Sequence, residues 1–253
     1  MGTLDGRTAL VTGGGRGVGQ GIALALAGEG AKVAVLGRSP GPLEATCTLV
    51  RERGGRAEPV PCDVSETAAV PGAVERAAAL LGPVDILVNN AYSGAYGRLE
   101  TLDDADLRRG FDSGPFAAFA FMKACRPHML ERGGGHVVNV ISSAVARWDP
   151  SSYGAYAAAK QALRSLSRTA AAEWGRDGIR VNAIAPLALS PGLRGWAERN
   201  PEEAEEFISS VPLGYLGDCE EDIGRAVAML TGPDARYLTG ATLGLDGGQA
   251  PFG

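Results

Sequence analysis

The stretch that decides the fold is ALVTGGGRGVGQGIALAL, residues 9–26. A short apolar run leads into a glycine cluster and then into a segment in which Val18, Ile22 and Leu26 recur at helical spacing. Glycines let a backbone approach a pyrophosphate closely, and the N-terminus of the following helix offers free N–H groups and a positive dipole end. The stretch therefore predicts a strand, a phosphate-binding turn and a helix.

The same alternation of short β-branched runs and longer helical segments continues along all 253 residues. It predicts strands near 7–12, 32–37, 57–62, 84–89, 136–142, 179–185 and 241–246. It predicts helices near 17–29, 41–53, 66–81, 101–131, 153–175 and 219–231. We therefore expect an α/β fold: one domain, residues 1–253, with a doubly wound, parallel, seven-stranded sheet and helices on both faces.

Residues 187–217 contain no predicted strand and carry Pro191, Pro201 and Pro212 together with a run of acids. A segment of that length inside one domain usually covers a binding site. We expect it to cover the substrate.

The bulk composition excludes several classes of partner. The formal net charge is -5, the isoelectric point is near 5.2, and neither a basic stripe nor a membrane-length apolar run is present. The N-terminus has no secretion signal pattern, and the four cysteines are too dispersed for a disulfide framework or a zinc cluster. We predict a cytoplasmic protein with a small-molecule partner, no metal, no nucleic acid and no membrane.

The second predicted strand ends VAVLGRSP, residues 33–40, which bears on the choice of dinucleotide. A site that prefers NAD carries an acid there to hold the ribose 2′-hydroxyl, but Gly37 and Arg38 occupy the region. A guanidinium binds a 2′-phosphate by charge-assisted hydrogen bonds, and Arg16 in the glycine turn is a second candidate. The pattern favours NADP(H).

The stretch YGAYAAAK, residues 153–160, holds one of only three lysines in the chain. Tyr156 and Lys160 are four residues apart and share a helix face, whereas Tyr153 has Ala157 at that offset. An ammonium close to the phenol is expected to lower its pKa from about 10 toward neutrality. Upstream, HVVNVISSAV, residues 136–145, is a buried strand that ends in two serines, and Ser143 lies thirteen residues before Tyr156.

Four motifs follow one another along the chain: Thr12-Gly13-x-x-x-Gly17-x-Gly19, Asn89-Asn90-Ala91, Ser143 and Tyr156-x-x-x-Lys160. In this order and spacing they resemble the short-chain dehydrogenase/reductase family, and the resemblance covers the whole chain. The resemblance implies a Rossmann fold in which Tyr156 is the general acid for ketone reduction, or the base for the reverse oxidation. It implies that Ser143 orients the carbonyl and that Lys160 holds the nicotinamide ribose and lowers the pKa of Tyr156. The residues it implies for cofactor binding are Thr12, Gly13, Arg16, Gly17, Val18, Gly19, Arg38, Asp63, Val64, Asn89, Ala91, Tyr156, Lys160 and Pro186. Asp63 is equally well read as a helix cap or turn residue.

Three positions depart from the family pattern. Tyr92 stands where the glycine of Asn-Asn-Ala-Gly is usual, and Leu187 follows Pro186 in place of another glycine. Phe111 stands where the family has an asparagine that helps hold the water linking the lysine to solvent. Pro115 cannot donate to the carbonyl of Phe111, so we expect a distorted helix whose free carbonyl takes over that role.

The function predicted is NADPH-dependent reduction of a mainly apolar ketone, or the reverse oxidation, by a homotetramer. The apolar character rests on loop residues expected to border the site: Tyr92, Tyr96, Trp148, Leu189, Leu193, Trp196, Phe207 and Tyr215. For Arg147, beside Trp148, two interpretations stay open: it binds an acidic group of the substrate, or it is a surface arginine without a role in binding. Two alternatives are a dinucleotide-sensing regulator without turnover and a cofactor-independent enzyme similar to halohydrin lyases.

Overall fold

The glycine-rich stretch folds as predicted, into β1 (Thr8–Thr12), a turn, and α1 (Gly17–Gly28). The computed structural model describes residues 2–147 and 152–252. The other strands are β2 (Lys32–Gly37), β3 (Arg56–Pro61), β4 (Ile86–Asn89), β5 (Gly135–Val140), β6 (Ile179–Pro186) and β7 (Thr242–Leu245). All neighbouring strands pair in parallel, in the order β3-β2-β1-β4-β5-β6-β7. The predicted doubly wound sheet of seven strands is confirmed.

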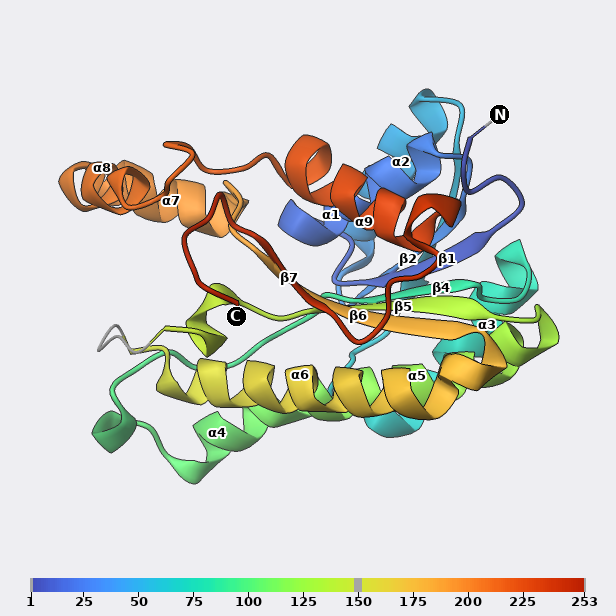
Figure 1. Ribbon diagram of the computed structural model, residues 1–253, viewed down its shortest axis with the longest axis horizontal. Coiled ribbons are helices and arrows are strands. Elements are labelled where there is room, and N and C mark those ends of the chain that lie inside the picture. Colours follow the sequence, from blue (N-terminus) through green and yellow to red (C-terminus); the bar gives the residue numbers. More distant parts are fainter. Residues whose placement is uncertain (1, 148–151, 253) are drawn as a thin grey trace.

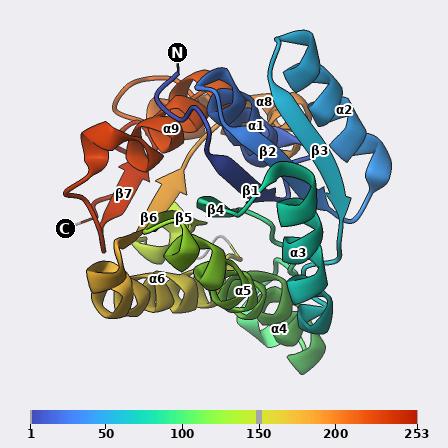
Figure 2. The same cartoon turned by 90° about the vertical axis from the view of Figure 1, so that its right-hand side faces the viewer.

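Helices cover both faces of this sheet. The α-helices after α1 are α2 (Pro40–Glu52), α3 (Val70–Leu81), α4 (Asp104–Phe111), α5 (Ala117–Glu131), α6 (Gly154–Trp174), α7 (Pro191–Arg199), α8 (Pro201–Ser209) and α9 (Arg225–Thr231). Short 3-10 turns are η1 (Thr67–Ala69), η2 (Leu99–Thr101), η4 (Ser143–Val145), η5 (Gly175–Asp177) and η7 (Pro233–Ala235), and the π-helices are η3 (Asp112–Phe116) and η6 (Cys219–Gly224). Figures 1 and 2 show α1, α2 and α9 on one face, with α3, α5 and α6 on the other.

The core lies in two layers, one on each side of the sheet. Strand β1 is buried throughout, and its side chains alternate between the layers: Ala9 and Val11 pack beneath α1, whereas Leu10 packs against the opposite helices. A parallel strand covered on both faces has to be apolar at every position, which is why its sequence shows no polar alternation. This burial fixes the position of the glycine turn that follows.

The strand order reverses at β1, which lies between β2 and β4. In open parallel sheets the crevice at such a switch point, outside the carboxyl ends of the strands, is where ligands bind. Helices α7 and α8 lie at this end of the sheet (Figure 1). They fall within the segment 187–217, for which we predicted no helix.

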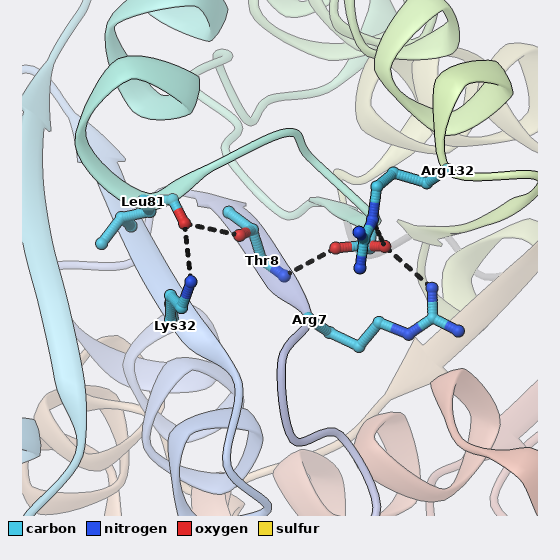
Figure 3. A network of polar contacts seen from close by, with 6 residues as sticks. Arg7, Thr8, Lys32, Leu81 and Arg132 are labelled. Carbon is cyan, nitrogen blue, oxygen red and sulfur yellow. Dashed lines mark hydrogen bonds and ion pairs between the residues drawn. The ribbon is translucent and has the colours of Figure 1, made fainter.

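A polar network closes the opposite, amino end of the sheet (Figure 3). Asp85 is 1% exposed and accepts hydrogen bonds from Arg7 at 2.8 Å, from Arg132 at 3.1 Å and from the Thr8 backbone at 2.9 Å. Nearby, Lys32 and the Thr8 hydroxyl both donate to the carbonyl of Leu81. These bonds tie the starts of β1, β2 and β4 to the ends of α3 and α5.

Candidate active site

The glycine turn at the end of β1 leaves the N-terminus of α1 open. Gly13 and Gly17 have φ values of 66° and 56°, in the region that favours glycine. A Cβ on Gly19 would collide with the carbonyl of Gly13, so the helix can approach the turn only without a side chain there. Arg16 precedes α1 without capping it through its side chain, and the first turn of α1 carries no acid. The first N–H groups of α1 are therefore suited to a pyrophosphate.

Asn90 braces this turn, a role that the sequence analysis did not assign. Its side-chain amide donates to the carbonyls of Thr12 at 2.9 Å and Gly13 at 3.2 Å. The Thr12 hydroxyl in turn accepts from the backbone N–H groups of Asn90 and Ala91. Asn89 is 5% exposed and donates to Asn139 inside the sheet, so its side chain and that of Thr12 lie behind the wall of the cleft.

A cavity of about 1680 Å³ runs along the carboxyl ends of the strands. The residues expected to bind the cofactor that line it are Gly13, Arg16, Gly17, Val18, Gly19, Arg38, Asp63, Val64, Ala91, Tyr156, Lys160 and Pro186. The side chains of Arg16 and Arg38 are exposed at one end, and no acid occupies position 37 or 38. Hydrogen bonds from Ser65, and then the charge of Arg38, hold the pKa of Asp63 below its usual value. The residues present fit a dinucleotide.

Tyr156 and Lys160 face the cavity from the first turns of α6, as their four-residue spacing predicts. Lys160 is 3% exposed and donates to the carbonyl of Val140 at 2.7 Å, and burial lowers its pKa to about 8. Burial raises the pKa of Tyr156, against a smaller lowering by a hydrogen bond with the Ser142 side chain. Lys160 lies 5.7 Å from the centre of the Tyr156 ring.

The expectation that Lys160 draws the pKa of Tyr156 toward neutrality needs correction for this structure. The shift of the phenol is upward, and its first cause is desolvation. Three further tyrosine rings pack against Tyr156: those of Tyr92 at 4.9 Å, Tyr96 at 5.5 Å and Tyr153 at 5.9 Å between ring centres. Such surroundings disfavour a phenolate more than the nearby ammonium favours it.

Both serines at the end of β5 line the cavity. Ser142, to which the sequence assigned no role, makes the hydrogen bond that affects Tyr156, and its hydroxyl also accepts from the Ala144 backbone at 3.2 Å. The role predicted for Ser143, to orient the substrate carbonyl, stays a prediction. Ser143 begins the turn η4. The spacing that points to Ser143 could not show that its neighbour would hold the phenol.

Tyr92, which replaces a glycine of the family pattern, lies between Lys160 and the helix distorted at Pro115. Tyr92 places its ring 5.0 Å from the Lys160 ammonium and packs against Gly110 and Gly114. Gly114 belongs to the π-helix η3, where the Ala117 backbone donates to the carbonyl of Asp112, five residues earlier. The distortion predicted from Pro115 is confirmed, whereas the water at the Phe111 carbonyl stays a prediction.

Helices α7 and α8 form the wall of the cavity beyond the tyrosines. Trp196 and Phe207 pack edge to face, with their ring centres 5.9 Å apart, and line the cavity together with Leu193. Of the other residues expected to border the site, Tyr92 and Tyr96 also line the cavity, Leu189 and Tyr215 do not, and Trp148 lies outside the described residues. Each helix begins with a proline, Pro191 or Pro201, in its first turn.

Polar side chains that the sequence analysis did not single out also line this cavity. Arg108 and Arg109 come from α4, and Gln249 comes from the segment after β7. Arg147 also lines the cavity. Within residues 2–147 and 152–252 we find no cluster of ligands for a metal ion. In the same ranges no helix has the length and apolar character needed to cross a membrane.

Known proteins resemble the chain over nearly all of its length. A family model described as Enoyl-(Acyl carrier protein) reductase matches residues 13–250. The 12alpha-hydroxysteroid dehydrogenase of a Clostridium species is 40% identical, with 98% of each chain covered. A putative short-chain alcohol dehydrogenase from Sinorhizobium meliloti 1021 superposes with a TM-score of 0.92 at 35% identity over 97% of each chain. A 7 alpha-hydroxysteroid dehydrogenase complexed with NADH and 7-oxo glycochenodeoxycholic acid has a TM-score of 0.91 at 32% identity, covering 97% of this chain and 94% of the other.

Proposed function

The chain belongs to the short-chain dehydrogenase/reductase family, whose members act on alcohol or ketone groups with a nicotinamide cofactor, and from this premise we propose that it is an NADPH-dependent reductase of ketones on an apolar, steroid-like skeleton. The same site can run the reverse oxidation. The observation that carries the proposal is the position of Tyr156 and Lys160 on the wall of one cavity that also reaches Trp196 and Phe207. Two hydroxysteroid dehydrogenases among the relatives support the choice of skeleton.

The cofactor supplies the hydride, and the residues of the chain supply binding and the proton. The glycine turn and the start of α1 would hold the pyrophosphate, and Lys160 the nicotinamide ribose. Tyr156 would donate its phenolic proton to the carbonyl oxygen, and its raised pKa keeps that proton in place over the whole physiological range. In the oxidative direction only the phenolate can accept a proton, and burial makes that phenolate harder to form.

We assign the two serines different roles. Ser143 would donate to the substrate oxygen as charge develops on it, and Ser142 would hold the Tyr156 hydroxyl through the contact already present. Ser143→Ala should then lower kcat for every substrate. Ser142→Ala should instead displace the pH profile of kcat/KM, because a contact that lowers the pKa of Tyr156 is lost. Equal loss in both variants with one unchanged pH profile would contradict this division.

The preference for NADPH is proposed from two exposed arginines that line the cavity, Arg16 in the glycine turn and Arg38 after β2. Replacing Arg38 by alanine should weaken NADPH binding roughly ten- to a hundredfold, the value of a charge-assisted hydrogen bond, and leave NADH nearly unchanged. Binding is measured by quenching of protein fluorescence. A wild-type preference for NADH would overturn this part of the proposal.

The experiment that tests the function is a screen of oxo and hydroxy steroid acids, beside simple ketones, with NADPH and NADH. Absorbance of the reduced nicotinamide reports turnover. We expect oxo steroids with NADPH to be the best substrates. Cofactor binding without turnover on any carbonyl compound would favour a dinucleotide-sensing regulator instead, and turnover without cofactor would favour a lyase.

We also expect a homotetramer in the cytoplasm. On α4, η3 and α5, Leu107, Phe116 and Phe119 are 44%, 54% and 46% exposed, more than a monomer usually leaves open on neighbouring turns. Light scattering after size-exclusion chromatography measures the mass. A monomer at micromolar concentration would contradict the expectation.

A further inference from the structure

Gln249 is the least satisfied polar side chain on the cavity wall. Both its amide nitrogen and its amide oxygen are buried, and neither has a hydrogen-bond partner within the described parts of the chain. Among the described residues, the other buried side-chain atoms without a partner belong to Asn89, Arg126 and His136, which have one such atom each. A buried amide with no partner loses its bonds to water without replacement, so such a group is expected to have a ligand or a function.

The backbone under Gln249 is firmly held. Asp246 is 4% exposed, and its carboxylate accepts from the N–H groups of Gly248 at 3.1 Å and Ala250 at 3.0 Å. Its carbonyl accepts from the N–H of Gln249 itself at 3.2 Å. The turn therefore surrounds one buried carboxylate, which holds the backbone on both sides of Gln249 in place.

This turn also lies next to the covering segment. The φ values of Gly247 and Gly248 are 64° and 88°, and a Cβ on either would press against Val211 or Pro212, the residues that follow α8. The C-terminal segment turns at the same end of the sheet as α7 (Figure 1). Gln249 thus lines the cavity from the side of α7 and α8, and it makes no hydrogen bond with Tyr156 or with either serine.

The chemistry of the amide selects its partner. Its nitrogen can only donate and its oxygen can only accept. A carbonyl would satisfy the nitrogen alone, and a carboxylate would set its charge against the amide oxygen. A hydroxyl donates and accepts at once, so it alone among these groups satisfies both atoms.

We infer that Gln249 recognises a second hydroxyl group of the substrate, separate from the oxygen that reacts at Tyr156. The inference rests on the proposed function and narrows it to hydroxylated ketones on an apolar skeleton. Gln249 is then a specificity residue: it discriminates between substrates without taking part in proton transfer.

The test compares 12-oxo steroid acids that carry additional ring hydroxyls with acids that lack them, in the wild type and in Gln249→Leu. Leucine has a similar volume and no polar atom. We expect kcat/KM for the preferred hydroxylated acid to fall roughly ten- to a hundredfold, while kcat/KM for the hydroxyl-free acid holds or rises. Gln161→Leu, on the exposed face of α6, is the matched control and should change neither value.

Calorimetry of the same acids on the cofactor-bound protein gives the comparison without turnover. Equal binding of hydroxylated and hydroxyl-free acids by the wild type, or a preference that survives in Gln249→Leu, would overturn the inference. A loss of equal size for both kinds of acid would show a merely structural role and would also overturn it. If none of the acids binds, the inference fails together with the steroid skeleton, whereas turnover of simple ketones would leave the reductase proposal standing.

Discussion

The two ends of the sheet differ in how many partners their buried polar groups have. At the amino end, Asp85 has two arginines and a backbone N–H as partners (Figure 3). At the carboxyl end, Lys160 is buried with a single carbonyl partner, and Gln249 has none among the described residues. The amino end thus contributes stability, whereas the carboxyl end keeps groups with shifted pKa values and unused hydrogen-bonding capacity, as expected of a site that has to bind and react.

Replacing the phenol of Tyr156 should reduce activity more than any other single change at the carboxyl end of the sheet. Tyr156→Phe removes the proton donor and keeps the ring that packs among Tyr92, Tyr96 and Tyr153, so we expect kcat to fall by about 10²- to 10⁴-fold. NADPH affinity should stay within a few fold. Tyr153→Phe is the matched control and should be mild. If the Tyr153 variant were the inactive one, the assignment of the lysine to Tyr156 would be wrong.

The buried ammonium should cost stability in a pH-dependent way. Burial lowers the pKa of Lys160 from 10.5 to about 8, so between these values the unfolded chain binds more protons than the folded one. The penalty is therefore complete below pH 8 and disappears as the pH rises toward 10.5. At about 1.4 kcal/mol per pKa unit, the lowered pKa of Lys160 corresponds to a penalty of about 3 kcal/mol. The hydrogen bond to Val140 offsets about 1 kcal/mol of it, which leaves a net cost of about 2 kcal/mol.

Lys160→Met tests this sign. We expect the variant to be more stable than the wild type at pH 7 by about 2 kcal/mol, and to lose that advantage by about pH 10. Denaturant unfolding at several pH values measures the difference in the free energy of unfolding between the variant and the wild type. Both proteins contain the same buried cysteines, so the titration of the cysteines does not contribute to this difference. A pH-independent difference would show that Lys160 is not strained by burial. Activity should be lost in this variant whatever its stability.

A substitution at the amino end of the sheet should lower the stability of the protein and leave its kinetic constants unchanged. Asp85→Ala leaves the Thr8 N–H without its acceptor, while Arg7 and Arg132, which are 41% and 42% exposed, can turn to water. We expect a cost of about 2 kcal/mol, or roughly 4–8 °C in Tm. KM and kcat at moderate temperature should hold. Asp85→Asn keeps an acceptor and should cost less, and a loss of activity without a loss of stability would contradict the comparison.

The parts of the fold and of the site that the sequence could predict are those that depend on local patterns. The central strands are buried on both faces and have a continuous apolar pattern. All seven strands, including the more exposed β3 and β7, were placed to within about two residues. Helices α7 and α8 were missed because Pro191 and Pro201 resembled chain breaks, although a proline in the first turn starts a helix well. Tyr156 and Lys160 were found because both lie on one helix.

Other parts of the site depend on contacts between distant segments and leave no local signal. Asn90 rather than Asn89 braces the glycine turn because its side chain comes out on the cleft side of β4. The isolation of Gln249 follows from the packing of the last turn against Val211 and Pro212. The upward pKa shift of Tyr156 arises first from burial and then from three tyrosines that two loops and a helix bring together. None of these can be read from spacing.

The smallest expected effect concerns the π-helix beside Lys160. Pro115 lacks the N–H that would bond the Phe111 carbonyl, and a Cβ on Gly114 would lie 3.9 Å from that of Ala159, the neighbour of Lys160. If the Phe111 carbonyl holds a relay water, Pro115→Ala should restore the regular helical bond and remove that acceptor. We expect kcat to fall roughly three- to tenfold with a larger solvent isotope effect, while NADPH affinity holds and thermal stability holds or rises. Pro127→Ala, at the second internal proline of the same helical stretch, is the matched control, because it restores a helical bond away from the cavity. Equal kcat and isotope effects in the wild type and in Pro115→Ala would show that the protons of Lys160 reach solvent by another route.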